Sequence, residues 1–88
     1  MKVHKRFLNL SMRSQFLNLP FEFQFISLKL VGGVPTLFFV GDEENEPIRM
    51  KVSVLTTGEE IPKDCIFLGT IEHEGLVRHY FINYWGTA

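Results

Sequence analysis

The sequence predicts an all-β protein: a single small antiparallel barrel or a two-layer sandwich of about six to seven strands. Three observations lead to this prediction. Apolar and polar residues alternate along several short segments, as in half-buried strands. Turn signals such as Gly32-Gly33 and Glu74-Gly75 separate these segments and favour antiparallel pairs. No apolar spacing of three and four residues extends over three helical turns, so we expect at most one helical turn, near residues 57–63.

The first half of the chain predicts four strands. Lys5 and Arg6 suit the exposed edge of a sheet, and Pro20 ends the second strand because proline cannot donate a hydrogen bond to a neighbouring strand. The two glycines after Val31 permit the tight turn of a hairpin. The four strands cover residues 3–10, 15–19, 26–31 and 34–40.

Residues 21–30 carry two alternating patterns that are out of step. Apolar side chains stand at odd positions up to Phe25 and at even positions from Ile26 onwards. A regular strand cannot keep both sets on one face, because side chains alternate between the two faces with period two. Either the strand begins late, or its pairing is irregular.

The second half predicts three strands in one continuous domain. The clearest half-buried strand has apolar side chains at Ile48, Met50, Val52 and Val54. An irregular segment follows at 56–64, in which Pro62 limits any helical turn. Residues 65–73 and 76–84 then form a hairpin. We expect a single β domain over residues 1–88, with a flexible tail at 83–88.

Composition points to a small cytosolic protein. The 88 residues are 45 % hydrophobic and include nine Phe, enough for a core. Cys65 is the only cysteine, which suits a reducing compartment. No signal peptide or apolar run of membrane-spanning length is recognisable, so we expect no membrane partner.

No residue pattern specifies a reaction. His4, His73 and His79 lack metal-ligand spacing, and the chain contains no nucleophile elbow, phosphate loop or dinucleotide fingerprint. We expect a non-enzymatic protein without metal or cofactor. The net charge of −1, and aromatics that are not interleaved with enough Lys or Arg, argue against a nucleic-acid partner.

Two surfaces are candidates for binding a partner. The first is an acidic segment that is either a solvated loop or a contact for a basic surface; it contains Asp42, Glu43, Glu44 and Glu46. The second lies near the C-terminus and has residue types enriched at interfaces, unless they simply close the end of a barrel; it contains Arg78, Tyr80, Tyr84 and Trp85.

The order of motifs resembles a family of small, largely uncharacterised bacteriophage and prophage proteins, over roughly residues 3–83. The motifs are Pro20, Gly33 with Pro35-Thr36-Leu37-Phe38, Thr57-Gly58-Glu59-Glu60-Ile61-Pro62, Leu68-Gly69-Thr70 and Leu76-Val77-Arg78-His79. The family commonly has Trp where Phe38 stands and His where Glu59 stands, so no histidine chemistry is carried over. The resemblance implies a phage origin and a compact β fold.

The resemblance also implies an answer for residues 21–30. It places Phe21 and Phe23 in the turn after the second strand, where they either cap an open end of the barrel or form an exposed patch for a partner. The change of phase at Phe25-Ile26 is then a strand boundary or a β-bulge. We expect the core-facing set to be Ile26, Leu28 and Leu30.

Given this resemblance, we expect a phage-encoded binding protein that inhibits a host protein or a host defence complex in the host cytoplasm. The alternative is an oligomeric module that sequesters a nucleotide signal. That module would use backbone amides and side chains at Thr57, Gly58, Arg78 and His79.

Overall fold

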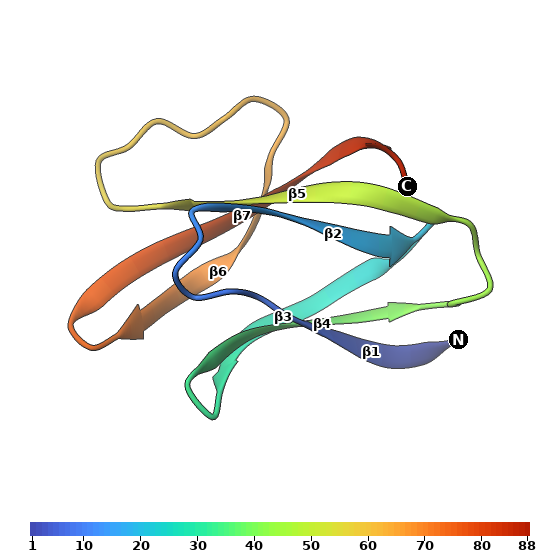
Figure 1. The fold of residues 1–88 in the computed structure, drawn as a ribbon, viewed down its shortest axis with the longest axis horizontal. Coiled ribbons are helices and arrows are strands. Elements are labelled where there is room, and N and C mark those ends of the chain that lie inside the picture. The colour runs from blue at the N-terminus through green and yellow to red at the C-terminus, as the bar shows by residue number, and fades with distance from the viewer.

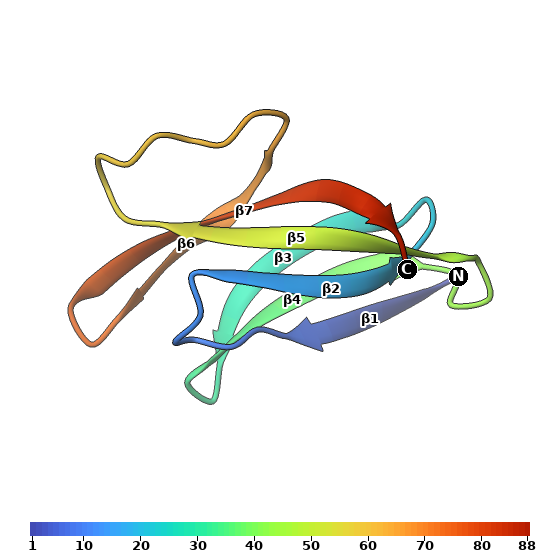
Figure 2. The ribbon, with the colours of Figure 1, turned by 45° about the horizontal axis from the view of Figure 1, so that its top comes forward.

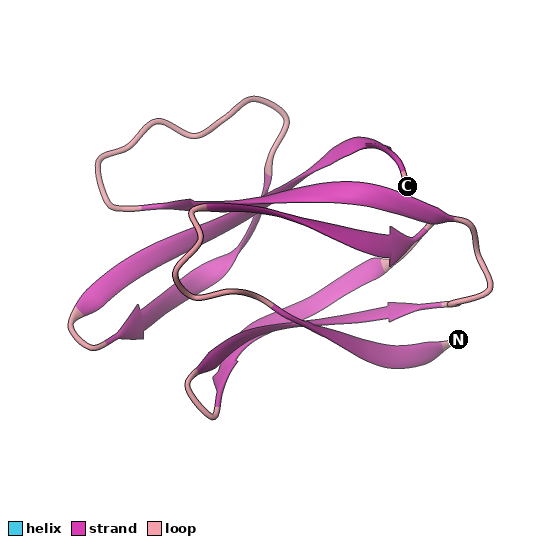
Figure 3. Cartoon of the chain, viewed as in Figure 1, coloured by secondary structure: helices cyan, strands magenta, loops and turns pink.

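Seven antiparallel strands and no helix make up the computed structural model, which describes residues 1–88 (Figures 1 and 3). The strands are β1 (Lys2–Phe7), β2 (Ser14–Pro20), β3 (Gln24–Val31), β4 (Val34–Gly41), β5 (Pro47–Leu55), β6 (Ile66–His73) and β7 (Leu76–Thr87). The all-β prediction is confirmed.

The strands form two sheets that pack face to face, so the fold is a two-layer sandwich and not a closed barrel. The three-stranded sheet has the order β1-β4-β3, and the four-stranded sheet has the order β2-β5-β7-β6. Figure 2 shows β3 and β4 behind the strands of the other sheet, with β1 below β2. The molecule is only 18 Å deep along its shortest axis, as expected for two sheets about 10 Å apart.

The core lies between the sheets and consists of alternate residues from both. On β5 the inward set is the one that the sequence indicates, and Val52 is fully buried opposite Ile82 of β7. Leu37 and Phe39 supply the facing layer from β4. The buried cluster is Leu8, Leu19, Leu37, Phe39, Met50, Val52, Val54, Leu68, Ile71, Tyr80 and Ile82.

Both tight hairpins are confirmed in the expected register. Val31 pairs with Val34, and His73 pairs with Leu76. The two residues of the second turn, Glu74 and Gly75, have φ values of 52° and 78°. Two successive positive φ values match the right-handed twist of the flanking strands, which explains the short connection.

A β-bulge at Ile26 resolves the two patterns of residues 21–30. Phe25 pairs with Phe39 and Ser27 pairs with Phe38, so Ile26 has no opposite residue. The extra residue shifts the alternation by one, and both Phe25 and Leu28 therefore lie on the side of β3 that faces the core. We expected either a strand boundary or a bulge, and the structure shows a bulge; the expected core-facing set is wrong at Ile26.

Only Leu28 of that expected set packs against the core. Ile26 is 47 % exposed because it is the bulged residue, and Leu30 is exposed because it lies at the end of the sheet beside the hairpin turn. The strand also begins earlier than expected, at Gln24.

The tail expected at residues 83–88 is also wrong, because β7 continues to Thr87. Ile48 pairs with Thr87, and Arg49 pairs with Gly86. The strand continues because β5 offers a long partner edge. Both termini consequently lie at the same end of the molecule (Figures 1 and 2).

The connection between β5 and β6 contains turns but no helix. Glu59 closes its first turn: the backbone N–H and hydroxyl of Thr56 both donate to Glu59 Oε1, at 2.8 and 2.7 Å. Arg13 donates to the same carboxylate. Glu59 therefore ties this loop to the turn between β1 and β2.

Candidate binding face

The outer surface of the four-stranded sheet gathers aromatic and cationic side chains and is not covered by the other sheet. Directly opposite residues of paired strands share a face, so the pairs place these side chains. Phe16 is opposite Lys51, and Ser53, Phe81 and Phe67 form one row across three strands. We call this surface the aromatic face; it consists of Phe16, Arg49, Lys51, Phe67, Phe81 and Trp85.

The rings of this face form two contacting pairs. The centroids of Phe16 and Trp85 are 5.5 Å apart, and those of Phe67 and Phe81 are 5.3 Å apart. Both pairs are tilted, which is a favourable arrangement for aromatic rings. Trp85 is 54 % exposed, and Phe16 and Phe67 are also exposed. The face therefore leaves large apolar surface in water.

Two cations lie against the first ring pair. The guanidinium carbon of Arg49 is 4.3 Å from the centroid of Phe16, and Nζ of Lys51 is 4.7 Å from the centroid of Trp85. Such cation–π contacts orient both side chains over the rings. Neither cation belongs to an ion pair of the molecule. Positive charge on this face is thus not balanced by a carboxylate.

A second β-bulge brings Trp85 to the aromatic face. Met50 pairs with Tyr84 and Arg49 pairs with Gly86, which leaves Trp85 without an opposite residue. Tyr84 lies on the side of Met50, toward the core side of the sheet, yet it is 58 % exposed at the end of the sandwich. Adjacent exposed aromatics therefore project to opposite sides of the sheet.

The contribution of β2 to this face was not expected from the sequence. Gln15, and not Phe16, points inward on β2, opposite Val52. The Gln15 side chain is buried because it accepts from the N–H of Asn9 at 2.8 Å and donates to the carbonyl of Asn9 at 3.1 Å. One feature of the sequence could have indicated this. Leu17 and Leu19 are at odd positions and would share one face of the strand, so Phe16, at an even position, would lie on the other face.

The four residues expected at the C-terminal surface do not form one surface. Tyr80 is fully buried in the core, so its expected place on a contact surface is wrong. Arg78 and Tyr84 share the inward side of β7 with it, whereas Trp85 alone joins the aromatic face. Burial raises the pKa of Tyr80, which keeps the phenol protonated at neutral pH.

The acidic segment lies between β4 and β5, and two of its four carboxylates interact with other groups of the protein. Glu43 pairs with Arg6 at 3.0 Å and lies 3.8 Å from Nδ1 of His4. The carboxylate of Asp42 accepts from the backbone N–H of Glu44 at 3.0 Å. Glu44 and Glu46 are the exposed acids without such contacts.

The two phenylalanines after Pro20 have different surroundings. Phe23 packs on the core with its ring edge toward Phe39, at a centroid distance of 6.2 Å, so it caps one end of the sandwich. Phe21 is 54 % exposed. Its carbonyl accepts from the Asn45 side chain, and its N–H donates to the carbonyl of Glu46. Phe21 therefore lies beside the acidic segment.

The residues of the expected nucleotide site are divided between two faces. Thr57, Gly58 and His79 line one shallow hollow, whereas Arg78 points to the opposite side of β7. Both ring nitrogens of His79 are 2.9 Å from a threonine hydroxyl, one from Thr57 and one from Thr70. His79 thus fixes the β5–β6 loop to the sheet.

The remaining features of the polar groups concern metal ligands and the single cysteine. No three His, Cys, Asp or Glu side chains come together as a metal site would require. Burial raises the pKa of the Cys65 thiol, and Asp64 adds to the effect, so the thiol stays protonated at neutral pH. No helix is present that has the length and apolar character to cross a membrane.

A comparison with known protein families finds one family that matches nearly the whole chain. The family described as a domain of unknown function (DUF7352) matches residues 1–86. The chain belongs to this family. No curated protein and no solved structure matches the chain. The family description states no activity.

Proposed function

We propose that this protein is a non-enzymatic binding module that attaches to a partner protein through its aromatic face. The observation that carries the proposal is the presence of three exposed rings, Phe16, Phe67 and Trp85, on one face of the four-stranded sheet. Exposed clusters of this kind mark interaction surfaces, and Trp and Arg are enriched among the residues that dominate binding energy.

The partner surface that fits this face is apolar at its centre and carries carboxylates at its rim. The rings would bury apolar area, while Arg49 and Lys51 would meet the carboxylates, since neither has one within the molecule. Complementary charge of this kind mainly favours the correct orientation and a fast association.

We further propose that the protein is encoded by a bacteriophage and acts in the host cytoplasm, where it inhibits a host protein or a host defence complex. The support for this setting is the resemblance of the ordered motifs to small phage and prophage proteins. A small protein with one contact face could inhibit a host protein by covering a surface that the host protein needs.

A single-stranded nucleic acid is the competing occupant, because aromatic rings beside cations on a sheet can stack bases. Two features favour a protein. The net charge is −1, and the only cations placed on the rings are Arg49 and Lys51, which is few for a strand with one phosphate per nucleotide. The nucleotide-sequestering alternative loses support because the Arg78 side chain points to the opposite side of β7 from the hollow that Thr57, Gly58 and His79 line.

The test is affinity capture from host lysate, with bound proteins identified by mass spectrometry and confirmed as purified pairs. Wild type is compared with a Phe16→Ser/Trp85→Ser variant and with Tyr84→Ser as the matched control. We expect the double variant to lose the partner and Tyr84→Ser to keep it. Equal retention by both variants would refute the aromatic face as the contact.

Two further measurements separate the other occupants. Fluorescence anisotropy with labelled single-stranded DNA and RNA reports nucleic-acid binding, and sedimentation velocity reports self-association. Tight oligonucleotide binding that Trp85→Ser abolishes would assign the face to nucleic acid. Dimers that dissociate in the double variant would assign it to a second copy.

A further inference from the structure

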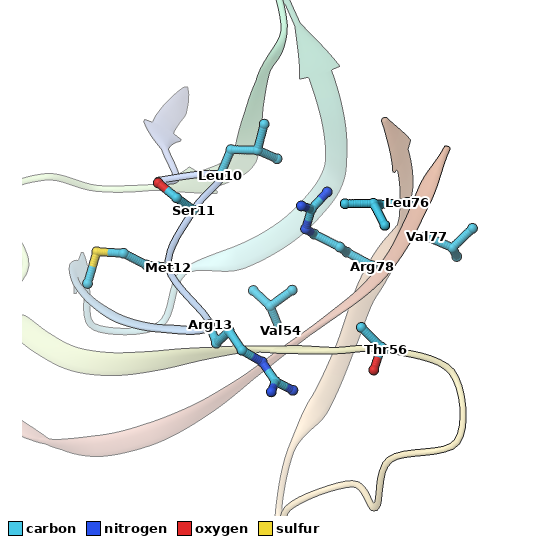
Figure 4. A pocket seen from close by; sticks show the side chains of 9 residues that line it. All are labelled: Leu10, Ser11, Met12, Arg13, Val54, Thr56, Leu76, Val77 and Arg78. Atoms are coloured by element: carbon cyan, nitrogen blue, oxygen red, sulfur yellow. The ribbon is translucent and has the colours of Figure 1, made fainter. Parts of the chain in front are cut away.

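A second, smaller site lies at the opposite end of the sandwich from the termini. A cavity of about 250 Å³ opens where the turn between β1 and β2 meets the end of β5 and the start of β7 (Figure 4). Leu10, Val54 and Leu76 form part of its mainly apolar wall. Arg78 and Arg13 are the charged residues of the lining.

Arg78 differs from the other three arginines of the chain. Arg6 and Arg13 are paired with carboxylates, and Arg49 lies over a ring. The Nη1 atom of Arg78, in contrast, is shielded from solvent and has no hydrogen-bond partner, and Arg78 belongs to no ion pair. A guanidinium N–H that is shielded from water and has no hydrogen-bond partner is unfavourable, even though the rest of the Arg78 side chain is only half-buried.

Tyr80 adds a second unsatisfied group beside Arg78. Its side chain is fully buried, and its hydroxyl has no hydrogen-bond partner. Tyr80 is two residues beyond Arg78 on the same side of β7, and the charge of Arg78 acts on the Tyr80 phenol. Buried polar groups are nearly always paired, so two neighbouring exceptions indicate a missing acceptor.

We propose that this cavity binds a carboxylate carried on an apolar chain. The guanidinium of Arg78 would hold the carboxylate oxygens, with the Tyr80 hydroxyl as a further donor, directly or through one water. The apolar chain would lie against Leu10, Val54 and Leu76. Figure 4 shows Arg78 extended toward Leu10, while Arg13 turns away toward the β5–β6 loop.

The charge and size of the cavity favour a carboxylate over a phosphate. Arg13 is committed to Glu59, which leaves one free cation to balance one negative charge. A phosphate group carries up to two charges at neutral pH and has no apolar part to cover the wall. The volume suits a short acid or the last residue of a peptide and not a nucleotide.

The test is a titration of isotope-labelled protein with sodium hexanoate, followed by NMR. We expect saturable shifts at Leu10, Val54, Leu76 and Arg78, and no such shifts with hexanamide or sodium phosphate. Peptides that end in leucine, with a free or an amidated C-terminus, show whether a chain terminus is also accepted. Equal binding of hexanamide, stronger binding of phosphate, or no saturable shift with hexanoate or the free peptide would overturn the proposal.

Variants then separate the site from the fold. Arg78→Met removes the charge and keeps an apolar stem, so we expect binding to fall at least about tenfold while the free protein stays folded. Arg78→Lys keeps the charge without the planar fork, and Tyr80→Phe removes one donor; both should weaken binding. Arg6→Gln, which also removes a guanidinium paired with a carboxylate but lies outside the cavity lining, is the matched control and should bind normally. Unchanged binding in Arg78→Met and Arg78→Lys would refute the role of Arg78.

Discussion

Truncating Phe23 and Phe21 in turn tests how the sandwich is closed at one end. The two residues have the same chemistry and are two positions apart, but only Phe23 packs on the core. Full burial makes a Phe→Ala change cost about 3–5 kcal/mol, so for a half-buried ring we expect a loss of about 2–3 kcal/mol in Phe23→Ala. This estimate includes the edge-to-face contact with Phe39.

Phe21→Ala should cost less than about 1 kcal/mol, because the ring is largely in water and the substitution keeps both backbone hydrogen bonds of the turn. For a domain of this size, about 1 kcal/mol corresponds to a shift in Tm of about 4–8 °C, so Phe23→Ala should melt about 8–24 °C below wild type. Urea denaturation and calorimetry measure both variants. Equal losses for Phe21→Ala and Phe23→Ala would refute this placement.

Three further predictions concern single features of the fold and surface. The contact with Arg13 lowers the pKa of Glu59 from 4.5 to about 2, so the contribution of the ionised Glu59 to the stability of the fold is complete above pH 4.5 and disappears as the pH falls through 2. The small difference in the free energy of unfolding between wild type and Glu59→Gln, measured by denaturation, should therefore shrink over that range. A constant difference would contradict the ion pair. Gly41→Ala would place a Cβ 2.9 Å from Cγ of the buried Pro20, and it should cost about 1–3 kcal/mol; unchanged stability in a melting experiment would show that the strands approach less closely. Replacing Asp42, Glu43, Glu44 and Glu46 by Asn or Gln should leave capture of the partner intact, since these four side chains belong to the β4–β5 loop and not to the aromatic face; lost capture would move the contact to the acidic segment.

The sequence predicts the seven strands along the chain and the two tight hairpins but not the irregularities that shape the surfaces. Val52 and Val54 alternate with polar residues, and the Gly32-Gly33 turn has a specific geometry, so local patterns suffice there. The bulges at Ile26 and Trp85 depend on which backbone groups form hydrogen bonds with the neighbouring strand. The sequence of one strand alone does not determine that pairing. The expected inward position of Ile26 and the tail at 83–88 failed for this reason.

The candidate site was harder to predict because it depends on neighbours across the sheet. Trp85 was identified from its residue type alone. Its contact with Phe16 and Lys51 requires the order β2-β5-β7, which joins three segments that are distant in sequence. Tyr80 was misplaced because a tyrosine on a strand suits a surface or a core equally well, and only the packing of the second sheet decides between them.

Trp85 is the only tryptophan of the chain, and it therefore reports directly on the aromatic face. The protein labelled with fluorotryptophan gives a single fluorine NMR signal, which can be followed while the unlabelled partner from the capture experiment is added. We predict that the signal shifts at saturation and becomes protected from a soluble paramagnetic agent. An unchanged, equally accessible Trp85 in the saturated complex would contradict the account.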